Sequence, residues 1–522
     1  MTRADPCLRR VHDHAELDAG QILQLAIRFT GLTRKTPTDR IAPAVAEELV
    51  DLASRARAAL SALLPTADAS GQPLLQAACD ALGEGVRDTQ APVFPREVLS
   101  GLARDAQGLK QSGIAAALND WIARHEKLEA RVRWLLEGTR PEELAGLDPV
   151  ADSDRIYHAV CSAFRVESRV LELLTINRIA QSSSASLFIR TTGESEHHAV
   201  RRFFDTFTLF AHYFEWGEDS LKGRTALGRI NAMHGRYTLP NEGMKYILLD
   251  GAFTYIDGAA RIAHRPLTEK EARGFFHAHI KLGQGMHIRE LSHDWDAMRA
   301  WFDDFNRRNA AHHSLKRETF ELFVKNSLGD ASLPGLGDAL LLAARAGMDD
   351  TFLQAVGYEA PTPEEVAAVR SVFFTLGHLN AKLPPTAWLR SLQHNPARPK
   401  GAKVEELGVH ARSAQVPSPH PDRPNGGLPE DQRPLLHAKE APPVDLPVIP
   451  MDEVRRHTTP ESLWVVIHGE VYDLTGWLQL HPGGLEVLQS VAGTDATQAY
   501  LASGHSEMAD VFRLNYRIGR VG

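Results

Sequence analysis

The chain has 522 residues, a length that favours several domains over one. Hydrophobic residues make up 43% and charged residues 24%, the balance of a soluble globular protein, and the formal net charge of −8 argues against nucleic acid as the main partner. Cys7, Cys79 and Cys161 lie far apart with no CxxC spacing. They indicate neither a disulfide framework nor a zinc site, so we expect a reducing compartment.

No stretch has the pattern of a targeting or membrane-spanning segment. The N-terminus, MTRADPCLRRVHDHAELDAG, lacks the apolar stretch of a secretory signal, and no run reaches the roughly 18 apolar residues of a membrane span. The most apolar window, residues 246–256, is short and contains Asp250, which predicts a buried helix. We therefore expect a soluble cytoplasmic protein without a transmembrane segment, and peripheral association with a membrane stays open.

Residues 1–150 are predicted to form a helical N-terminal region. Residues 42–64 and 113–136 carry apolar side chains at helical spacing and are rich in helix-forming residues. No catalytic constellation is visible in this region, which favours a scaffold.

Residues 151–390 are predicted to form a second, larger helical domain. Thr268 stands before two carboxylates, Glu269 and Glu271, and Thr362 stands before Pro363. A threonine cap followed by carboxylates or proline in the first turn is typical of a helix start.

Residues 391–446 are predicted to be a proline-rich flexible linker, since ten prolines fall among the 48 residues from Pro396 to Pro443. Such a composition buries too little apolar surface to offset the chain entropy. An extended tether is the expectation. The alternative is an irregular ordered loop that wraps the helical domain.

Residues 447–522 are predicted to form a small α+β domain. Two β-rich runs, residues 463–467 and 470–474, flank His468-Gly469, the pattern of two strands joined by a tight turn. Further on, His481 and His505 lie 24 residues apart. A haem iron with two axial imidazoles needs one histidine from each wall of an apolar slot.

The segment from about Val448 to Gly519 resembles the cytochrome b5 family in LWVVIHGEVYDLTGWLQLHPGG, AGTDAT and GHS. The resemblance implies one haem b with His481 and His505 as the axial iron ligands. Leu480 and Tyr500 are expected in its apolar lining. Trp477 and Ser503 stand where a phenylalanine and an aliphatic residue are usual, which affects pocket polarity but not ligation. Six-coordinate iron has no open position, so this domain is expected to carry electrons.

The larger domain offers a second candidate site. Arg202 and Thr206 are four residues apart and share a helix face. His234 ends another helical pattern, and a single histidine on an apolar helix face can bind haem iron from one side. A lone histidine is more often a hydrogen-bonded core residue. This pattern alone therefore leaves two interpretations of His234 open, an iron ligand and a core residue.

The region from Asp152 to Ile288 resembles the MpaB/rubber oxygenase (latex-clearing) family. The matching motifs are Arg202-Phe-Phe-Asp205-Thr206, Gly217-Glu-Asp219-Ser220, Arg229-Ile-Asn231-Ala-Met-His234-Gly-Arg-Tyr237, Asn241-Glu-Gly-Met244, Arg265-Pro-Leu-Thr-Glu269 and Met286-His-Ile288. The resemblance implies an all-helical domain with a second haem b, His234 as its proximal ligand, and Arg202 and Thr206 in the haem pocket. Members of this family cleave carbon–carbon double bonds of isoprenoid chains with molecular oxygen. His212 departs from a common carboxylate and Trp216 from a common histidine, and no distal base is assigned.

Other histidines do not form a known metal motif. The helical region that holds His277, His279, His287 and His293 lacks the paired carboxylate-x-x-His motifs of a di-iron oxygenase. The HxxHH box of a membrane desaturase is missing as well. His197-His198 and His312-His313 are expected on surface loops. No Walker or Rossmann glycine pattern appears, so the reductase is expected to be a separate flavin protein.

The sequence thus predicts a mainly α, soluble two-haem oxygenase. The b5-like domain would pass electrons to the iron at His234, where molecular oxygen oxidises an apolar substrate, for which an unsaturated isoprenoid or a lipid is the candidate. Two alternatives remain: a non-enzymatic electron-transfer or haem-sensing protein with a scaffold domain, and an oxygenase-like domain that has lost its haem.

Overall fold

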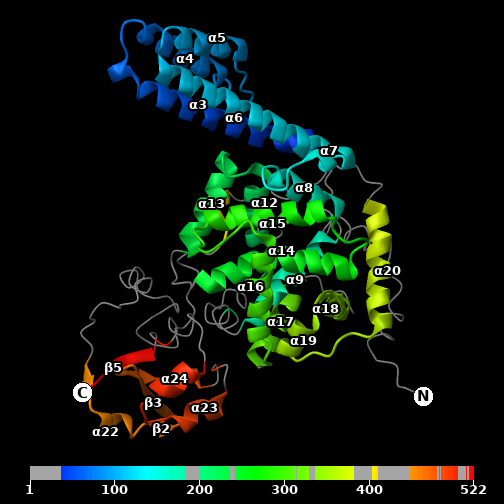
Figure 1. Ribbon diagram of the computed structural model, residues 1–522, viewed down its shortest axis with the longest axis vertical. Coiled ribbons are helices and arrows are strands. Elements are labelled where there is room, and N and C mark those ends of the chain that lie inside the picture. The colour runs from blue at the N-terminus through cyan, green and yellow to red at the C-terminus, as the bar shows by residue number, and fades with distance from the viewer. Residues whose placement is uncertain are drawn as a thin grey trace.

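The computed structural model describes residues 37–165, 167–182, 185, 199–234, 241–312, 314–327, 336–380, 403–408, 447–478, 481, 484–503, 513 and 516–522. Figure 1 shows an N-terminal helical bundle, a larger helical body and a small C-terminal unit with a sheet. The predicted fold class, mainly α with a small α+β domain at the C-terminus, is confirmed. Within these ranges no helix combines the length and the apolar character that crossing a membrane requires.

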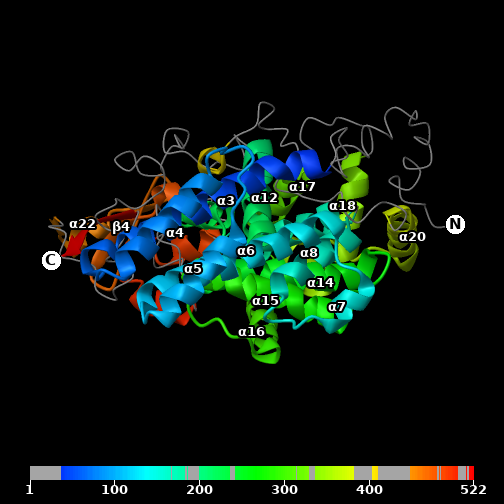
Figure 2. The same ribbon diagram turned by 90° about the horizontal axis from the view of Figure 1, so that it is seen from above.

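The N-terminal bundle has its own apolar core. Its helices are α3 (Pro37–Ser61), α4 (Gly71–Gly85), α5 (Arg96–Gly108) and α6 (Ser112–Glu137), with the short η1 (Leu64–Thr66) after α3. Leu60, Leu75, Leu118 and Trp121 are buried between them. Seen from above in Figure 2, the bundle lies across the helical body. The predicted helical character of residues 42–64 and 113–136 is thereby confirmed.

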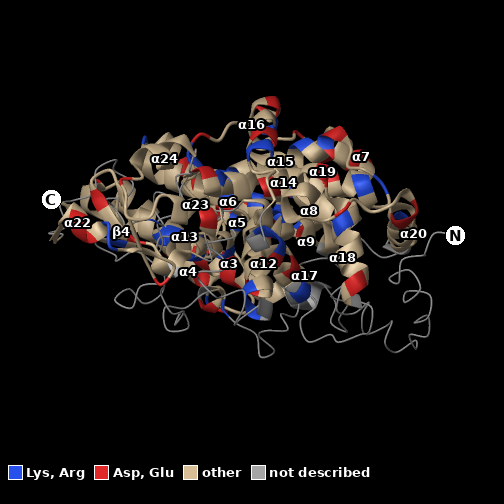
Figure 3. Cartoon of the chain, turned by 90° about the horizontal axis from the view of Figure 1, so that it is seen from below, with Lys and Arg blue, Asp and Glu red and all other residues tan. Residues whose placement is uncertain are grey.

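The helical body contains the large apolar core of the molecule. Its elements are α7 (Pro141–Gly146), α8 (Ser153–Ala163), α9 (Ser168–Arg178), η2 (Ile179–Gln181), α12 (Ala199–Trp216), α13 (Leu221–His234), α14 (Asn241–Ile262), α15 (Glu269–Gly285), α16 (Trp295–Arg308), α17 (Ser314–Ser327), α18 (Leu336–Gly347), α19 (Asp350–Val356) and α20 (Pro363–Asn380). On the side seen in Figure 3, acidic and basic residues are interspersed along the helices. Charges of both signs are thus mixed on the side shown in Figure 3.

Helix α14 is largely buried, as the apolar window at residues 246–256 predicted. Tyr246, Leu249 and Phe253 are fully buried on it, and so is Asp250. Burial raises the pKa of the Asp250 carboxyl well above its usual value, and the Thr254 hydroxyl donates to it at 2.5 Å. A protonated carboxyl held by a hydroxyl is tolerated in an apolar core because it carries no charge.

Two predicted helix starts are confirmed in detail. Thr268 precedes α15 and forms a reciprocal capping box with Glu271, whose side chain accepts from the Thr268 amide at 2.8 Å. Thr362 precedes α20 and exchanges the same pair of contacts with Glu365. Each box satisfies amide groups that a helix N-terminus leaves without an intrahelical partner.

The C-terminal unit is a five-stranded sheet with short helices. Its elements are β1 (Val448–Ile449), α22 (Met451–Val454), β2 (Thr458–Thr459), β3 (Ser462–Ile467), β4 (Glu470–Asp473), η7 (Thr475–Trp477), α23 (Leu485–Ser490), α24 (Thr497–Ala502) and β5 (Arg517–Val521), and the sheet order is β1-β5-β4-β3-β2. β3 and β4 form the predicted hairpin, with His468 and Gly469 both at positive φ in its turn. Positive φ at both central residues matches the twist of the flanking strands.

One short element lies within the stretch predicted as a linker. η5 (Val404–Glu406) packs against α13, and Leu407 is buried there. The prolines that suggested an extended chain fall before Lys400 and after Gln415, whereas this short stretch carries two aliphatic side chains. Composition averaged over residues 391–446 hides that local pattern. The rest of that stretch lies outside the described residues, and the proposed domain boundaries stay predictions.

Candidate functional site

Helices α12 and α13 form a hairpin whose open end holds the predicted site residues Arg202, Thr206 and His234. The two helices pack side by side and are joined by a short loop, so the start of α12 lies near the end of α13. Arg202 and Thr206 share a face, as predicted. The Arg202 guanidinium donates to the Thr206 hydroxyl oxygen, and that hydroxyl donates to the Arg202 carbonyl at 2.7 Å.

His234 is the last residue of α13 and presents a neutral imidazole. Burial lowers the pKa of its ring to about 4, and the nearby positive charge of Arg202 lowers it further in the same direction. Its Nδ1 atom is buried and has no hydrogen-bond partner among the described residues. An iron ligand requires an unprotonated imidazole, and His234 meets that requirement, so it fits a haem at this position.

His212 on α12 is a second candidate histidine, and it is more deeply buried than His234. Burial and the charge of Lys222 lower the pKa of His212 to about 3, and its Nδ1 also lacks a partner among the described residues. Lys222 stands at the start of α13, so His212 lies toward the loop end of the hairpin, away from Arg202. His212 is therefore the alternative candidate for the iron ligand, and an experiment has to distinguish it from His234.

Trp216, the other departure from the family pattern, has a packing role. Its side chain is 1% exposed and packs with Ile41 of α3 and Leu135 of α6. The end of α12 is thus a docking point for the N-terminal bundle. Sequence reasoning missed this contact because nothing in the local pattern links residues so far apart in the chain.

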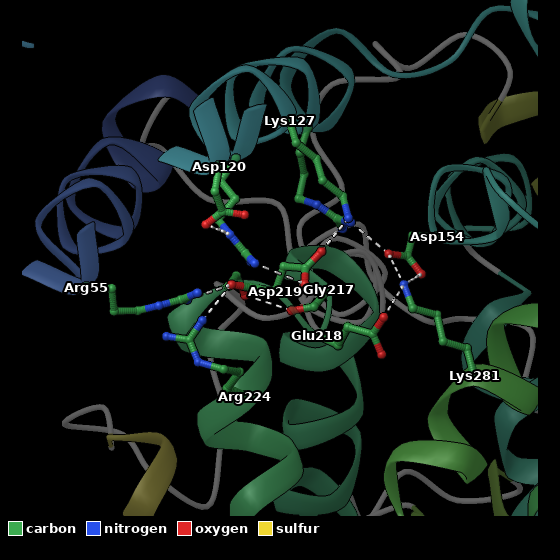
Figure 4. Close-up of polar contacts among 12 residues, drawn as sticks. Arg55, Asp120, Lys127, Asp154, Gly217, Glu218, Asp219, Arg224 and Lys281 are labelled. Atoms are coloured by element: carbon green, nitrogen blue, oxygen red, sulfur yellow. Dashed lines mark hydrogen bonds and ion pairs between the residues drawn. The ribbon is translucent and has the colours of Figure 1, made fainter. Parts of the chain in front are cut away.

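The loop between α12 and α13 is held by charged side chains from several helices (Figure 4). Asp219 pairs with Lys127 of α6, and Arg55 of α3 donates to its carbonyl at 3.4 Å. Arg224 donates to the same carbonyl at 2.5 Å. Asp219, part of the motif that the family resemblance rests on, therefore serves to join the bundle to the hairpin.

A buried ion pair supports the same loop. Arg131 of α6 meets Asp154 of α8 at 2.7 Å and donates to the Glu215 carbonyl at 2.8 Å. Lys281 of α15 lies 3.2 Å from Asp154 as well. Gly217 has φ +80°, and a β-carbon there would come within 2.6 Å of the Arg131 guanidinium. Glycine is therefore required at this position.

Several histidines that form no metal motif in the sequence have other partners, and His197, His198 and His313 lie outside the described residues. His279 donates through Nδ1 to the Phe275 carbonyl at 2.9 Å, and His277 and His293 meet at 3.1 Å between their Nδ1 atoms. His312 lies 3.2 Å from the Ala355 carbonyl. Among the residues that the structure describes, no three histidine, cysteine or carboxylate side chains are grouped for a metal ion.

In the C-terminal unit, a backbone contact orients the ring of His481. The Nδ1 atom of His481 lies 3.1 Å from the Gly484 carbonyl. A proton on Nδ1 donated to that oxygen leaves the lone pair on Nε2, the arrangement found for metal-binding histidines. Tyr500 on α24 packs against the apolar core of the C-terminal unit, which includes Leu478 and Leu488. His505 and Leu480 lie outside the described residues, so their roles stay predictions.

Two protein-family models match the chain. Residues 185–378 match "ER-bound oxygenase mpaB/B'/Rubber oxygenase, catalytic domain", which includes Arg202, Thr206 and His234. Residues 450–522 match "Cytochrome b5-like Heme/Steroid binding domain", which includes His481 and His505. The chain joins an MpaB/rubber oxygenase catalytic domain to a cytochrome b5-like domain. Both family resemblances are confirmed, and we now call the two parts the oxygenase domain and the b5 domain.

Individual relatives match over a short length. Cytochrome b5 of Rhizopus stolonifer is 47% identical over 72 residues, and cytochrome b5 type B of Rattus norvegicus is 48% identical over 71 residues; each match covers 14% of this chain and respectively 55% and 49% of the relative. Nitrate reductase [NADH] 1 of Zea mays is 46% identical over 71 residues, 11% of its length. The chain thus spans about half of these cytochromes b5 and about a tenth of the reductase.

Proposed function

We propose that the chain is a two-haem oxygenase, in which the b5 domain delivers electrons to a haem b held by His234. The observation that carries the proposal is the half-buried, neutral imidazole of His234, whose Nδ1 atom is buried, beside the charge of Arg202. Haem b held there would supply a redox-active iron able to react with molecular oxygen. The family match to an oxygenase catalytic domain supports the same reading.

Arg202 and Thr206 are proposed to bind and orient the anionic edge of the haem. Arg202 is exposed, and its guanidinium is held by a hydrogen bond to the Thr206 hydroxyl, one helical turn further along α12. A guanidinium near a haem can pair with a propionate through charge-assisted hydrogen bonds. Thr206 acts as a positioning residue, because its hydroxyl contacts Arg202 at both the side chain and the carbonyl.

The b5 domain is proposed to carry electrons, with His481 and His505 as its two iron ligands. Ligation by two imidazoles fills the coordination sphere, so this domain exchanges electrons without binding oxygen or substrate. Its reductant is proposed to be a separate flavin reductase, since the sequence shows no nicotinamide or flavin motif. The substrate is proposed to be apolar, an unsaturated isoprenoid or a lipid, by resemblance to the rubber oxygenases.

The haem-to-protein ratio of the full-length chain and its histidine variants tests this proposal. The wild type should bind two haems, and His234→Gln should bind one while keeping the spectrum of the b5 domain. His212→Gln is the matched control, because the His212 ring is also neutral but lies away from Arg202. It should keep two haems. One haem in the wild type would favour an electron-transfer protein with a scaffold domain. Loss of haem in His212→Gln but not in His234→Gln would show that His212 is the ligand instead of His234.

A further inference from the structure

Residues 403–408, which we call the clasp, return to the oxygenase domain after α20 and lie against α12 and α13. Leu407 is 2% exposed and packs in one cluster with Leu209 of α12 and Ile230 of α13, and Val404 packs against the same cluster. A fully buried leucine stabilises such a contact because it removes apolar surface from water. The clasp is therefore part of the core under the His234 hairpin.

Each helix of the hairpin also makes a polar bond to the clasp. The Gly408 amide donates to the Asp205 carboxylate at 2.9 Å, and this bond is buried. The Leu407 carbonyl accepts from Arg229 Nε at 2.7 Å. Asp205 adjoins Thr206 on α12, and Arg229 precedes His234 on α13, so two residues of the family motifs are engaged with the clasp.

The end of the clasp admits only glycine. Gly408 has φ +80°, and a β-carbon there would lie 2.3 Å from the sulfur of Met233, the neighbour of His234. Both the backbone conformation and the close approach exclude a larger residue without movement. The clasp therefore ends in contact with the residue next to the proposed iron ligand.

The clasp lies beyond the part of the chain that matches the oxygenase family, which ends at residue 378. The chain then runs from Gly408 through residues 409–447 to β1 of the b5 domain. The connection between the two domains is thus anchored beside His234 and not at the end of α20. The stretch of chain between the last anchored residue and the b5 domain is therefore residues 409–447 instead of residues 381–447.

We propose that the clasp is a positioning element that anchors the b5 domain beside the His234 site for electron transfer. The electron-transfer part rests on the proposed function, in which haems held by His481 and by His234 would exchange one electron with no bond made or broken. The effective concentration of a tethered domain falls with about the −3/2 power of the tether length. Release of the clasp should therefore lower the effective concentration of the b5 domain at the His234 site about two-fold. The decrease should be larger if the anchor also orients the b5 domain.

The clasp itself is tested without reference to haem. Hydrogen exchange and limited trypsin cleavage after Lys403 are measured on the full-length chain, on Leu407→Ala and on Gly408→Val. We expect amide protection at Leu407 and Gly408 in the wild type, a loss of at least about ten-fold in both variants, and faster cleavage. Val372→Ala, which truncates a side chain that is 57% exposed on α20, should match the wild type. Unprotected clasp amides in the wild type would overturn the inference.

The positioning role is tested by the rate of electron transfer between the two haems. Leu407→Ala should keep both haem spectra and slow the transfer at least about two-fold, and Leu407→Met should restore the rate. An unchanged rate after loss of clasp protection would overturn the anchoring role. A chain with one haem would instead contradict the proposed function, and the exchange result on the clasp would still hold.

Discussion

The Glu48 carboxylate on α3 accepts a hydrogen bond of 2.8 Å from the backbone amide of Lys222 at the start of α13. It also accepts from the Leu221 amide, so one buried side chain caps the helix that ends in His234. A carboxylate at a helix N-terminus satisfies unpaired amides and interacts favourably with the helix dipole. The N-terminal bundle is thus fastened to the candidate site by a cap as well as by the Trp216 contact.

Removal of this cap should destabilise the folded chain. Glu48→Ala is expected to lower the free energy of unfolding by about 1–2 kcal/mol, the usual cost of a lost N-cap. Glu48→Gln should cost less because it keeps an acceptor oxygen. Chemical denaturation followed by circular dichroism measures both. Glu47→Ala is the control: Glu47 pairs with the Lys222 ammonium but is 60% exposed, so its loss should cost about 0–1 kcal/mol. Equal losses for the two alanine variants would refute the capping role.

The buried Arg131–Asp154 pair should be the more sensitive contact. Asp154→Asn is expected to cost about 3–5 kcal/mol, because it leaves the Arg131 charge in a buried site without its partner. Burial alone would raise the pKa of Asp154, but the charges of Arg131 and Lys281 outweigh it and hold the pKa below its usual value. The stability that the ionised carboxylate contributes is therefore present above its usual pKa and lost as the pH falls through the lowered one. The Asp154→Asn variant should show a weaker acid dependence of unfolding than the wild type.

His279 should contribute to acid sensitivity in a higher pH range. Burial lowers the pKa of its ring from 6.5 to about 4, although the bond to the Phe275 carbonyl opposes the shift. Between these values the unfolded chain takes up a proton that the folded chain refuses, so stability falls as the pH falls. His279→Phe keeps a ring among the aromatic neighbours and should remove about 1.4 kcal/mol per pH unit from that slope. An unchanged slope between about pH 4 and 6.5 would show that His279 is not held neutral.

Much of the fold follows from local sequence signals. The Thr268 capping box, the start of α20 at Pro363 and the β3–β4 hairpin all depend on residues within a few positions of one another, where steric and hydrogen-bond rules act directly. The shared face of Arg202 and Thr206 follows from the same helical geometry.

Contacts between distant segments did not follow from the sequence. Glu48 meets Lys222, and Gly408 meets Asp205, across long stretches of chain, and no periodicity records such a pair. The proline-rich average likewise concealed the clasp, because a short apolar segment contributes little to composition. The family resemblance placed His234, His481 and His505, but it did not indicate that the N-terminal bundle and the clasp both hold the helices of the site.

The two haem sites should be separable by substitution in the b5 domain. His481→Ala is expected to remove the low-spin haem of that domain and to leave the haem at His234, because the iron ligands that we propose for the two sites belong to different domains. Absorption spectra of the reduced and oxidised variant measure this. Trp477→Phe should keep the two-imidazole spectrum, since Trp477 is buried against Tyr516, at 5.2 Å between ring centroids, and is no ligand. Loss of both haems in His481→Ala would contradict independent sites.

Carbon monoxide binding to the reduced full-length chain tests the central claim most directly. An iron ligated by two imidazoles binds the gas poorly, whereas an iron held by His234 alone has an open position for it. We predict one carbon monoxide per chain in the wild type and none in His234→Gln. A reduced wild-type chain with a full complement of haem that binds no carbon monoxide would contradict the account of the oxygenase domain.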